Sequence, residues 1–143
     1  MGQAPSLQDL VASLRAAEDQ LLMIENRELL LSRALDEARK AQEAVSSLPE
    51  SGSLELLVPI GGGVLLPVVY MGGRSPLLSV GADVFVEGAK AKALSFLSQR
   101  DKELEQLLQQ VRAEKARVLD MVERLRQEIA KMIQEQRGHA RGA

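Results

Sequence analysis

Two long segments of the chain carry apolar residues at alternating spacings of three and four, with charged and polar residues between them. The first segment extends over residues 6–48 and the second over residues 89–136. An apolar repeat of 3.5 residues that is sustained over several heptads is typical of a coiled coil rather than of a short surface helix. Because the segments are of similar length and a compact middle joins them, we expect them to pair as an antiparallel two-helix coiled coil.

Polar residues interrupt both seams and predict how the two helices face each other. If facing residues have numbers that add to about 143, Glu28 meets Lys115, Gln42 meets Asp101 and Leu7 meets Gln136. Unlike charges then meet inside the seam. Polar seam residues often fix the register of a coiled coil, so we take this pairing as a hypothesis.

The middle, residues 53–87, predicts two β-hairpins. Its short runs, rich in Val, Leu and Ile and separated by glycine turns, are "LELLVPI", "VLLPVVYM", "PLLSV" and "DVFVE". The uncharged stretch 56–73 has the length of a membrane span. However, the glycines at 61–63 and the nearby Pro59 and Pro67 would break a membrane helix. No Lys and Ser/Thr follow the glycines, as a phosphate-binding loop requires. A hairpin turn is the better interpretation.

Four short apolar strands cannot form a stable isolated sheet, because their edges are unpaired and both faces are hydrophobic. We therefore expect the same region of other subunits to cover them in a shared β-barrel body. The predicted oligomerisation residues are Leu57, Val58, Ile60, Val64, Leu66, Val68, Val69, Leu78, Val80, Val84 and Val86.

Composition argues against most site chemistry. The chain has no cysteine, 2% aromatic residues and a formal net charge of -2, which leaves no thiolate metal site and no indication of a nucleic-acid partner. Its one histidine, His139, falls in a glycine-containing tail, residues 137–143, that we expect to be disordered. We therefore predict no catalytic residues, no metal and no cofactor.

The amino-terminal residues predict a helix cap. Ser6 precedes Asp9 by three residues, a variant of the capping box. Gly2 and Ser6 also match the short myristoylation pattern, which often occurs by chance. The segment lacks the features of a secretory signal, and we expect a cytoplasmic protein that binds no membrane.

The order of helix, two hairpins and helix resembles the α-type subunit of prefoldin, an archaeal and eukaryotic co-chaperone. The resemblance covers nearly the whole chain, and its most specific parts are "LLVPIGGGVLLPVVY" and "LLSVGADVFVEGAKAKALSFL". Two hairpins point to the α-type, since β-type subunits have one. The sequence departs from the usual pattern at "EGAKAKA", which is rich in glycine and alanine where charged residues commonly start the second helix.

The resemblance implies a hexamer of two α-type and four β-type prefoldin subunits, whose coiled-coil ends hold unfolded client proteins without ATP. Such an assembly passes its clients to a group II chaperonin. Carried to this chain, the client-binding residues are Leu7, Leu10, Val11, Leu14, Leu21, Leu22, Met121, Val122, Leu125, Ile129, Met132 and Ile133.

Some apolar residues near the coil ends fall outside the seam positions, among them Val11, Leu22, Met23, Leu119, Met121 and Ile133. They either bind clients or widen the seam, and Leu29 and Leu30 are equally open. Two functions of other classes stay open as well: a structural coiled-coil scaffold or filament-forming protein, and an enzyme that holds a nucleotide at the glycine turn.

Overall fold

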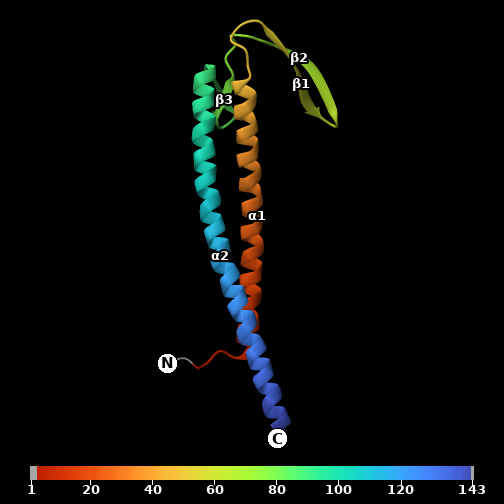
Figure 1. Ribbon diagram of the computed structural model, residues 1–143, viewed down its shortest axis with the longest axis vertical. Coiled ribbons are helices and arrows are strands. Elements are labelled where there is room, and N and C mark those ends of the chain that lie inside the picture. The colour runs from red at the N-terminus through yellow and green to blue at the C-terminus, as the bar shows by residue number, and fades with distance from the viewer. Residues whose placement is uncertain (1–2, 143) are drawn as a thin grey trace. The chain divides into compact units, whose positions relative to one another are not determined.

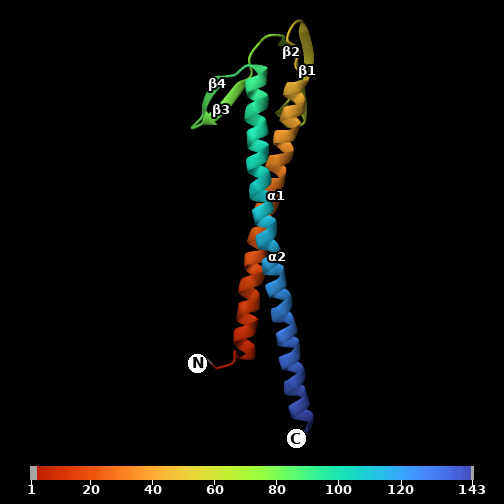
Figure 2. The same cartoon turned by 60° about the vertical axis from the view of Figure 1, so that its left-hand side comes forward.

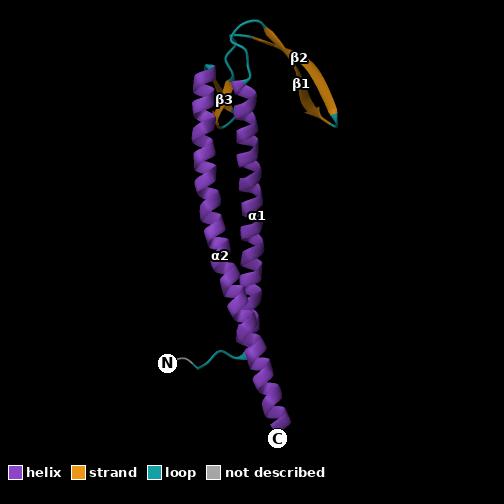
Figure 3. Ribbon diagram, viewed as in Figure 1, coloured by secondary structure: helices purple, strands orange, loops and turns teal. Residues whose placement is uncertain are grey.

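The computed structural model describes residues 3–142, so Gly2, with its myristoylation pattern, and Ala143 lie outside the described residues. The elements are α1 (Leu7–Ser46), β1 (Ser53–Gly61), β2 (Val64–Met71), β3 (Leu77–Gly81), β4 (Val84–Glu87) and α2 (Lys90–Gly142) (Figure 1). Figure 3 distinguishes the helices, in purple, from the strands, in orange. The chain forms two compact units: the base unit, residues 34–104, and the end unit, residues 3–33 with 105–142.

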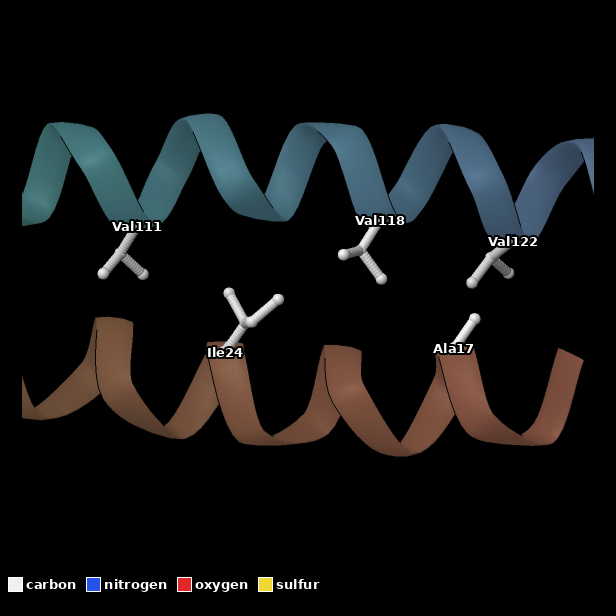
Figure 4. Packing of buried hydrophobic residues seen from close by; sticks show 5 residues of the cluster. All are labelled: Ala17, Ile24, Val111, Val118 and Val122. Carbon is white, nitrogen blue, oxygen red and sulfur yellow. The ribbon is translucent and has the colours of Figure 1, made fainter. Parts of the chain in front are cut away.

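In the end unit the two helices run side by side in opposite directions (Figures 1 and 2). Their core is a single row of buried seam residues, Ala17, Ile24, Val111, Val118 and Val122, and four leucines pack against it. Ile24 lies between Val111 and Val118, and Ala17 faces Val122 (Figure 4). Burial of each larger side chain contributes about 1.5–3 kcal/mol. The expected coiled coil is confirmed.

Ion pairs across the end unit confirm the central part of the predicted register. Lys115 Nζ lies 3.5 Å from Glu28 Oε2, as the seam charges predicted. Two further pairs flank the seam, Arg27 with Glu114 at 3.5 Å and Arg126 with Glu18 at 3.0 Å. Glu28 Oε2 is buried without a hydrogen-bond partner, so only the charge of Lys115 compensates for its lost hydration. The pairing of Leu7 with Gln136 stays a prediction.

Helix α1 begins at the predicted cap. The backbone N–H of Asp9 donates to Ser6 Oγ, and the backbone N–H of Ser6 donates to Asp9 Oδ2, both at 3.1 Å. These reciprocal bonds satisfy donors that the first helical turn leaves free. The hydrogen bond from the Ser6 backbone, followed by that from the Ser6 side chain, holds the pKa of Asp9 below its ordinary value.

The expected disordered tail is wrong for the residues that the structure describes. Helix α2 continues through residues 137–142 and ends at Gly142, so His139 lies on an exposed helical turn. Gly138 costs about 1 kcal/mol relative to alanine but does not stop a helix as proline does. His139 and Arg141 are in the last turn, where positive charge suits the carbonyl end of the helix.

In the base unit, Asp101 Oδ2 accepts a hydrogen bond from Arg39 Nε at 3.1 Å. Arg39 lies one turn from Gln42, and the facing of Gln42 and Asp101 in the register stays a prediction. An arginine one turn away offers a charge-assisted bond that a neutral glutamine cannot match. Gln42 still borders the same surface depression as Arg39 and Asp101.

Both predicted hairpins are present in the base unit. Strands β1 and β2 pair antiparallel from Ser53↔Met71 to Gly61↔Val64, and β3 pairs with β4 from Leu77↔Glu87 to Gly81↔Val84. The glycine run makes the first turn, with positive φ at Gly61, Gly62 and Gly63. Other residue types rarely adopt this conformation. The run joins two paired strands and opens no helix, so it is a hairpin turn and not a strand-to-helix phosphate loop.

The charged seam pair should contribute to pairing specificity more than to stability. Replacing Lys115 with Met leaves the buried Glu28 oxygen without a counter-charge, and we expect the free energy of unfolding to fall by about 1–3 kcal/mol. Replacing both Glu28 and Lys115 with Leu should restore it or raise it. Urea unfolding followed by circular dichroism measures both changes.

The matched control is Lys40→Met, which breaks the exposed i,i+4 pair with Asp36. This change should lower the free energy of unfolding by no more than about 0.5 kcal/mol. A double leucine variant as unstable as Lys115→Met would contradict the expectation, because the loss would then not come from an unpaired charge.

Candidate functional site

The first hairpin exposes apolar side chains on both of its faces. Leu57 is exposed on one face, while Val58 and Ile60, which alternate with it along β1, are exposed on the other. On β2, the exposed side chains are Val64, Leu65, Leu66, Val68, Val69 and Met71. No described residue of the base unit covers either face, although one covered face is the usual condition for a stable small sheet.

The second hairpin is similar except at one residue. Val80, Val84 and Val86 are exposed, as expected for an assembly surface, whereas Leu78 is buried. A Cβ on Gly88 would lie 2.7 Å from Leu78 Cδ1, so Leu78 packs against the glycine just before α2. Leu78 therefore anchors this hairpin within its own subunit and is not available to another.

Four exposed apolar residues of the hairpins were missing from the predicted set: Leu65, Met71, Leu77 and Phe85. Strand alternation could have found Leu65 and Met71, because they share a face of β2 with Val69, which was predicted. Leu77 and Phe85 lie on the other face of the second hairpin from Leu78 and Val86, so alternation with the predicted residues does not identify them. Each of the two hairpins is therefore a candidate assembly surface of the base unit.

The predicted client-binding residues differ widely in exposure. Leu10 and Val122 are buried in the seam, and Leu7, Val11, Leu14, Leu21, Leu125, Ile129 and Met132 are half-buried. Leu22, Met121 and Ile133 are exposed. Most of this set therefore holds the two helices together, and a client reaches those side chains only where the helix ends separate.

Larger exposed side chains lie elsewhere in the end unit. Met23, Leu29, Leu30 and Leu119 are exposed on the helix surfaces outside the seam, and so is Leu107. The first four had been noted from their positions but not assigned a role. At the ends of the helices, Ala4 and Pro5 border a shallow depression together with Leu10 and Met132.

The described residues offer no arrangement for metal or membrane chemistry. Among residues 3–142, no three His, Asp or Glu side chains lie together as metal ligands would. Neither α1 nor α2, as far as it is described, combines the length and hydrophobicity needed to cross a bilayer.

Comparison with known sequences gives a consistent set of relatives. A family model described as "Prefoldin subunit" matches residues 17–135. "Prefoldin subunit alpha" of Methanoculleus marisnigri is 39% identical over 92 residues, 64% of this chain and 57% of that protein. "Prefoldin subunit alpha" of Archaeoglobus fulgidus is 26% identical over 131 residues, 91% of this chain and 96% of that protein.

Two solved structures share the fold. The crystal structure of the prefoldin beta subunit from Thermococcus strain KS-1 aligns with a TM-score of 0.66 at 19% identity, over 92% of this chain and 95% of that chain. The cryo-EM structure of filamentous PFD from Methanocaldococcus jannaschii aligns with a TM-score of 0.66 at 20% identity, over 82% of this chain and 98% of that chain. With a family match over most of its length and the fold of paired helices around hairpins, the chain belongs to the prefoldin subunit family.

Proposed function

We propose that this chain is the α-type subunit of an ATP-independent chaperone that holds unfolded polypeptides and delivers them to a group II chaperonin in the cytoplasm. Two copies assemble with four β-type subunits through their hairpins, which form a shared β-barrel body. The end unit of each copy holds the client. The protein is not an enzyme and needs no cofactor.

The observation that carries this proposal is the uncovered first hairpin. Both of its faces are apolar and exposed, and its strands have free edges. An isolated subunit therefore leaves apolar surface in water that an assembly would bury. Closing such hairpins into a common barrel removes both the exposed faces and the free edges. The names of the curated relatives favour the α-type role in that assembly.

We assign client binding to the ends of the two helices in the end unit. Terminal turns of helices fray at little cost in free energy, so half-buried seam residues such as Leu7, Leu14, Ile129 and Met132 can exchange one apolar partner for another. Ile133 is exposed without any opening. This mechanism requires no nucleotide, because capture and release are both governed by apolar burial.

A second candidate is a filament-forming scaffold that uses the hairpins to polymerise and holds no client. The likeness to the filamentous PFD structure favours it. The chaperone and the scaffold are distinguished by the size of the assembly and by whether it suppresses the aggregation of a client.

The assembly should depend on the hairpins. Mixed with β-type subunits of the same cell, the chain is expected to give one species with two copies of itself and four of the partner, measured by native mass spectrometry. Replacing Leu57 and Val69, which are exposed on one face of the hairpin, with Arg should abolish that species at micromolar concentration while leaving the helical content unchanged.

The matched control for this variant is Leu107→Arg, which places a charge at an equally apolar exposed position outside the hairpins. It should assemble normally. A discrete hexamer that survives the double arginine change would refute assembly through the first hairpin, and an open-ended series of masses would favour the filament.

Client protection should depend on the coil ends. An assembly in which this chain lacks residues 1–20 and 124–143 is expected to form normally but to lose most of its ability to keep a denatured client from aggregating, measured by light scattering. The reason is that most of the predicted client-binding residues are removed. Unchanged protection by the truncated assembly would mean that these ends do not hold clients.

A further inference from the structure

Each strand of the first hairpin contains one proline, Pro59 in β1 and Pro67 in β2. Among the described strands β1 and β2 pair only with each other, so each has one edge free for a strand of another subunit. Proline has no backbone N–H and removes one donor from whichever edge its nitrogen faces. The direction of the two nitrogens therefore decides whether the prolines affect the hairpin itself or its contact with other subunits.

One backbone hydrogen bond fixes these directions. The N–H of Gly72 donates to the carbonyl oxygen of Gly52 at 2.8 Å, one step beyond the register pair Ser53↔Met71. Opposite residues in antiparallel strands alternate between pairs that bond to each other and pairs whose N–H and C=O groups point outward. The register has no shift up to Pro59↔Leu65, so the alternation holds that far. The outward-pointing residues are Ser53, Glu55, Leu57 and Pro59 on β1 and Leu65, Pro67, Val69 and Met71 on β2.

Both prolines stand at outward positions. They therefore cost no hydrogen bond between β1 and β2, and each removes a donor from a free edge. The outward donors form an unbroken series over residues 53–57 on β1 and over residues 69–71 on β2. These two runs share the end of the hairpin away from the glycine turn, and we call them the open half. Residues 58–68 include Pro59 and Pro67 and have an interrupted edge on both sides, and we call them the blocked half.

The second hairpin has no such block. The N–H of Gly88 donates to the carbonyl oxygen of Pro76 at 3.0 Å, so the same alternation makes Leu77 and Phe85 outward positions with their donors present. Its strands are five and four residues long, against nine and eight residues in the first hairpin. A long apolar edge is the kind that adds strands without limit, and a proline on the edge prevents this. The prolines thus occur on the two strands with the longest edges.

Pairing of the open half with a second copy of this chain is disfavoured. If two copies used every donor over residues 53–57, the antiparallel pair would be centred on Glu55 and would place two carboxylates directly opposite each other, which is destabilising. If β1 of one copy paired with β2 of the next, the missing donor of Pro67 would interrupt the ladder beyond Val69. The open half therefore suits a strand of a different subunit better than a strand of its own copy.

We infer that Pro59 and Pro67 are specificity-determining residues of the assembly, because they confine strand pairing with a β-type subunit to the open half of the first hairpin. This inference rests on the proposed function and adds to it a register for the subunit contact. It also adds a limit. Copies of this chain cannot build a continuous ladder along either edge, so they do not polymerise through this hairpin.

Two matched proline variants, each mixed with the β-type subunit, test the confinement. Val69 and Leu65 each lie two residues from Pro67, share a face of β2, and are 60% and 55% exposed. Val69→Pro removes a donor from the open half and should raise the concentration for half-assembly about tenfold, equivalent to about 1.4 kcal/mol. Leu65→Pro removes a donor from the blocked half and should change that concentration less than about twofold. Native mass spectrometry over a dilution series measures both, and circular dichroism checks that the helices are retained.

Hydrogen exchange gives a readout that needs no substitution. In the wild-type assembly, the backbone N–H groups of Glu55 and Val69 should exchange at least about tenfold more slowly than in the isolated chain, because they gain acceptors. The N–H of Leu65 should exchange at a similar rate in both states. The measurement is made by mass spectrometry resolved to single amides. Slowing of the Leu65 amide to the same extent as Val69 would overturn the inference.

Restoring the missing donors tests the limit on polymerisation. Replacing both Pro59 and Pro67 with Val makes both edges continuous. The variant alone is then expected to form a series of larger masses that the wild-type chain does not form. A mass distribution unchanged from that of the wild type would overturn the role assigned to the two prolines.

The proposed function and this inference fail in different ways. If the wild-type chain forms no species of two copies with four β-type subunits, the proposed assembly fails and the open half loses its occupant. If that species forms and Val69→Pro and Leu65→Pro weaken it equally, or neither weakens it, only the role of the prolines is refuted.

Discussion

Pairing of the two apolar seams is the interaction on which the rest of the structure depends. Neither helix would be stable alone in water, because helical stability in proteins comes mainly from packing of an apolar face. Ile24 lies between Val111 and Val118 (Figure 4). The core at this point is narrow, because it consists of one layer of side chains between the two helices. The helices therefore present nearly all of their remaining surface to solvent, and function has to be found on that surface.

Such a narrow core makes charged residues in the seam more important than they would be in a globular protein. Glu28 and Lys115 interrupt the apolar row at facing positions, and their attraction is lost in any shifted register. The flanking pair of Arg27 and Glu114 favours the same alignment. These pairs add little net stability, since desolvation offsets much of the Coulomb attraction. Their effect is to make one antiparallel alignment better than its neighbours, which an all-leucine seam would not do.

Periodicity was sufficient to predict the helices, the seam and the hairpins, because each is set by local spacing of residue types. It also placed Glu28 opposite Lys115. It failed where a competing local interaction decided the outcome. Leu78 is buried because Gly88 leaves space beside it. Helix α2 continues past Gly138 because one glycine weakens a helix without ending it.

The candidate surfaces were only partly predictable for a related reason. A heptad pattern states which residues point into the seam, but it does not state how far each residue outside the seam is exposed. Leu29 and Leu30 were therefore indistinguishable from seam-widening leucines until the structure showed their exposure. Exposed leucine and methionine side chains on an outer helix face oppose solubility, and their exposure is a feature that the pattern alone does not explain.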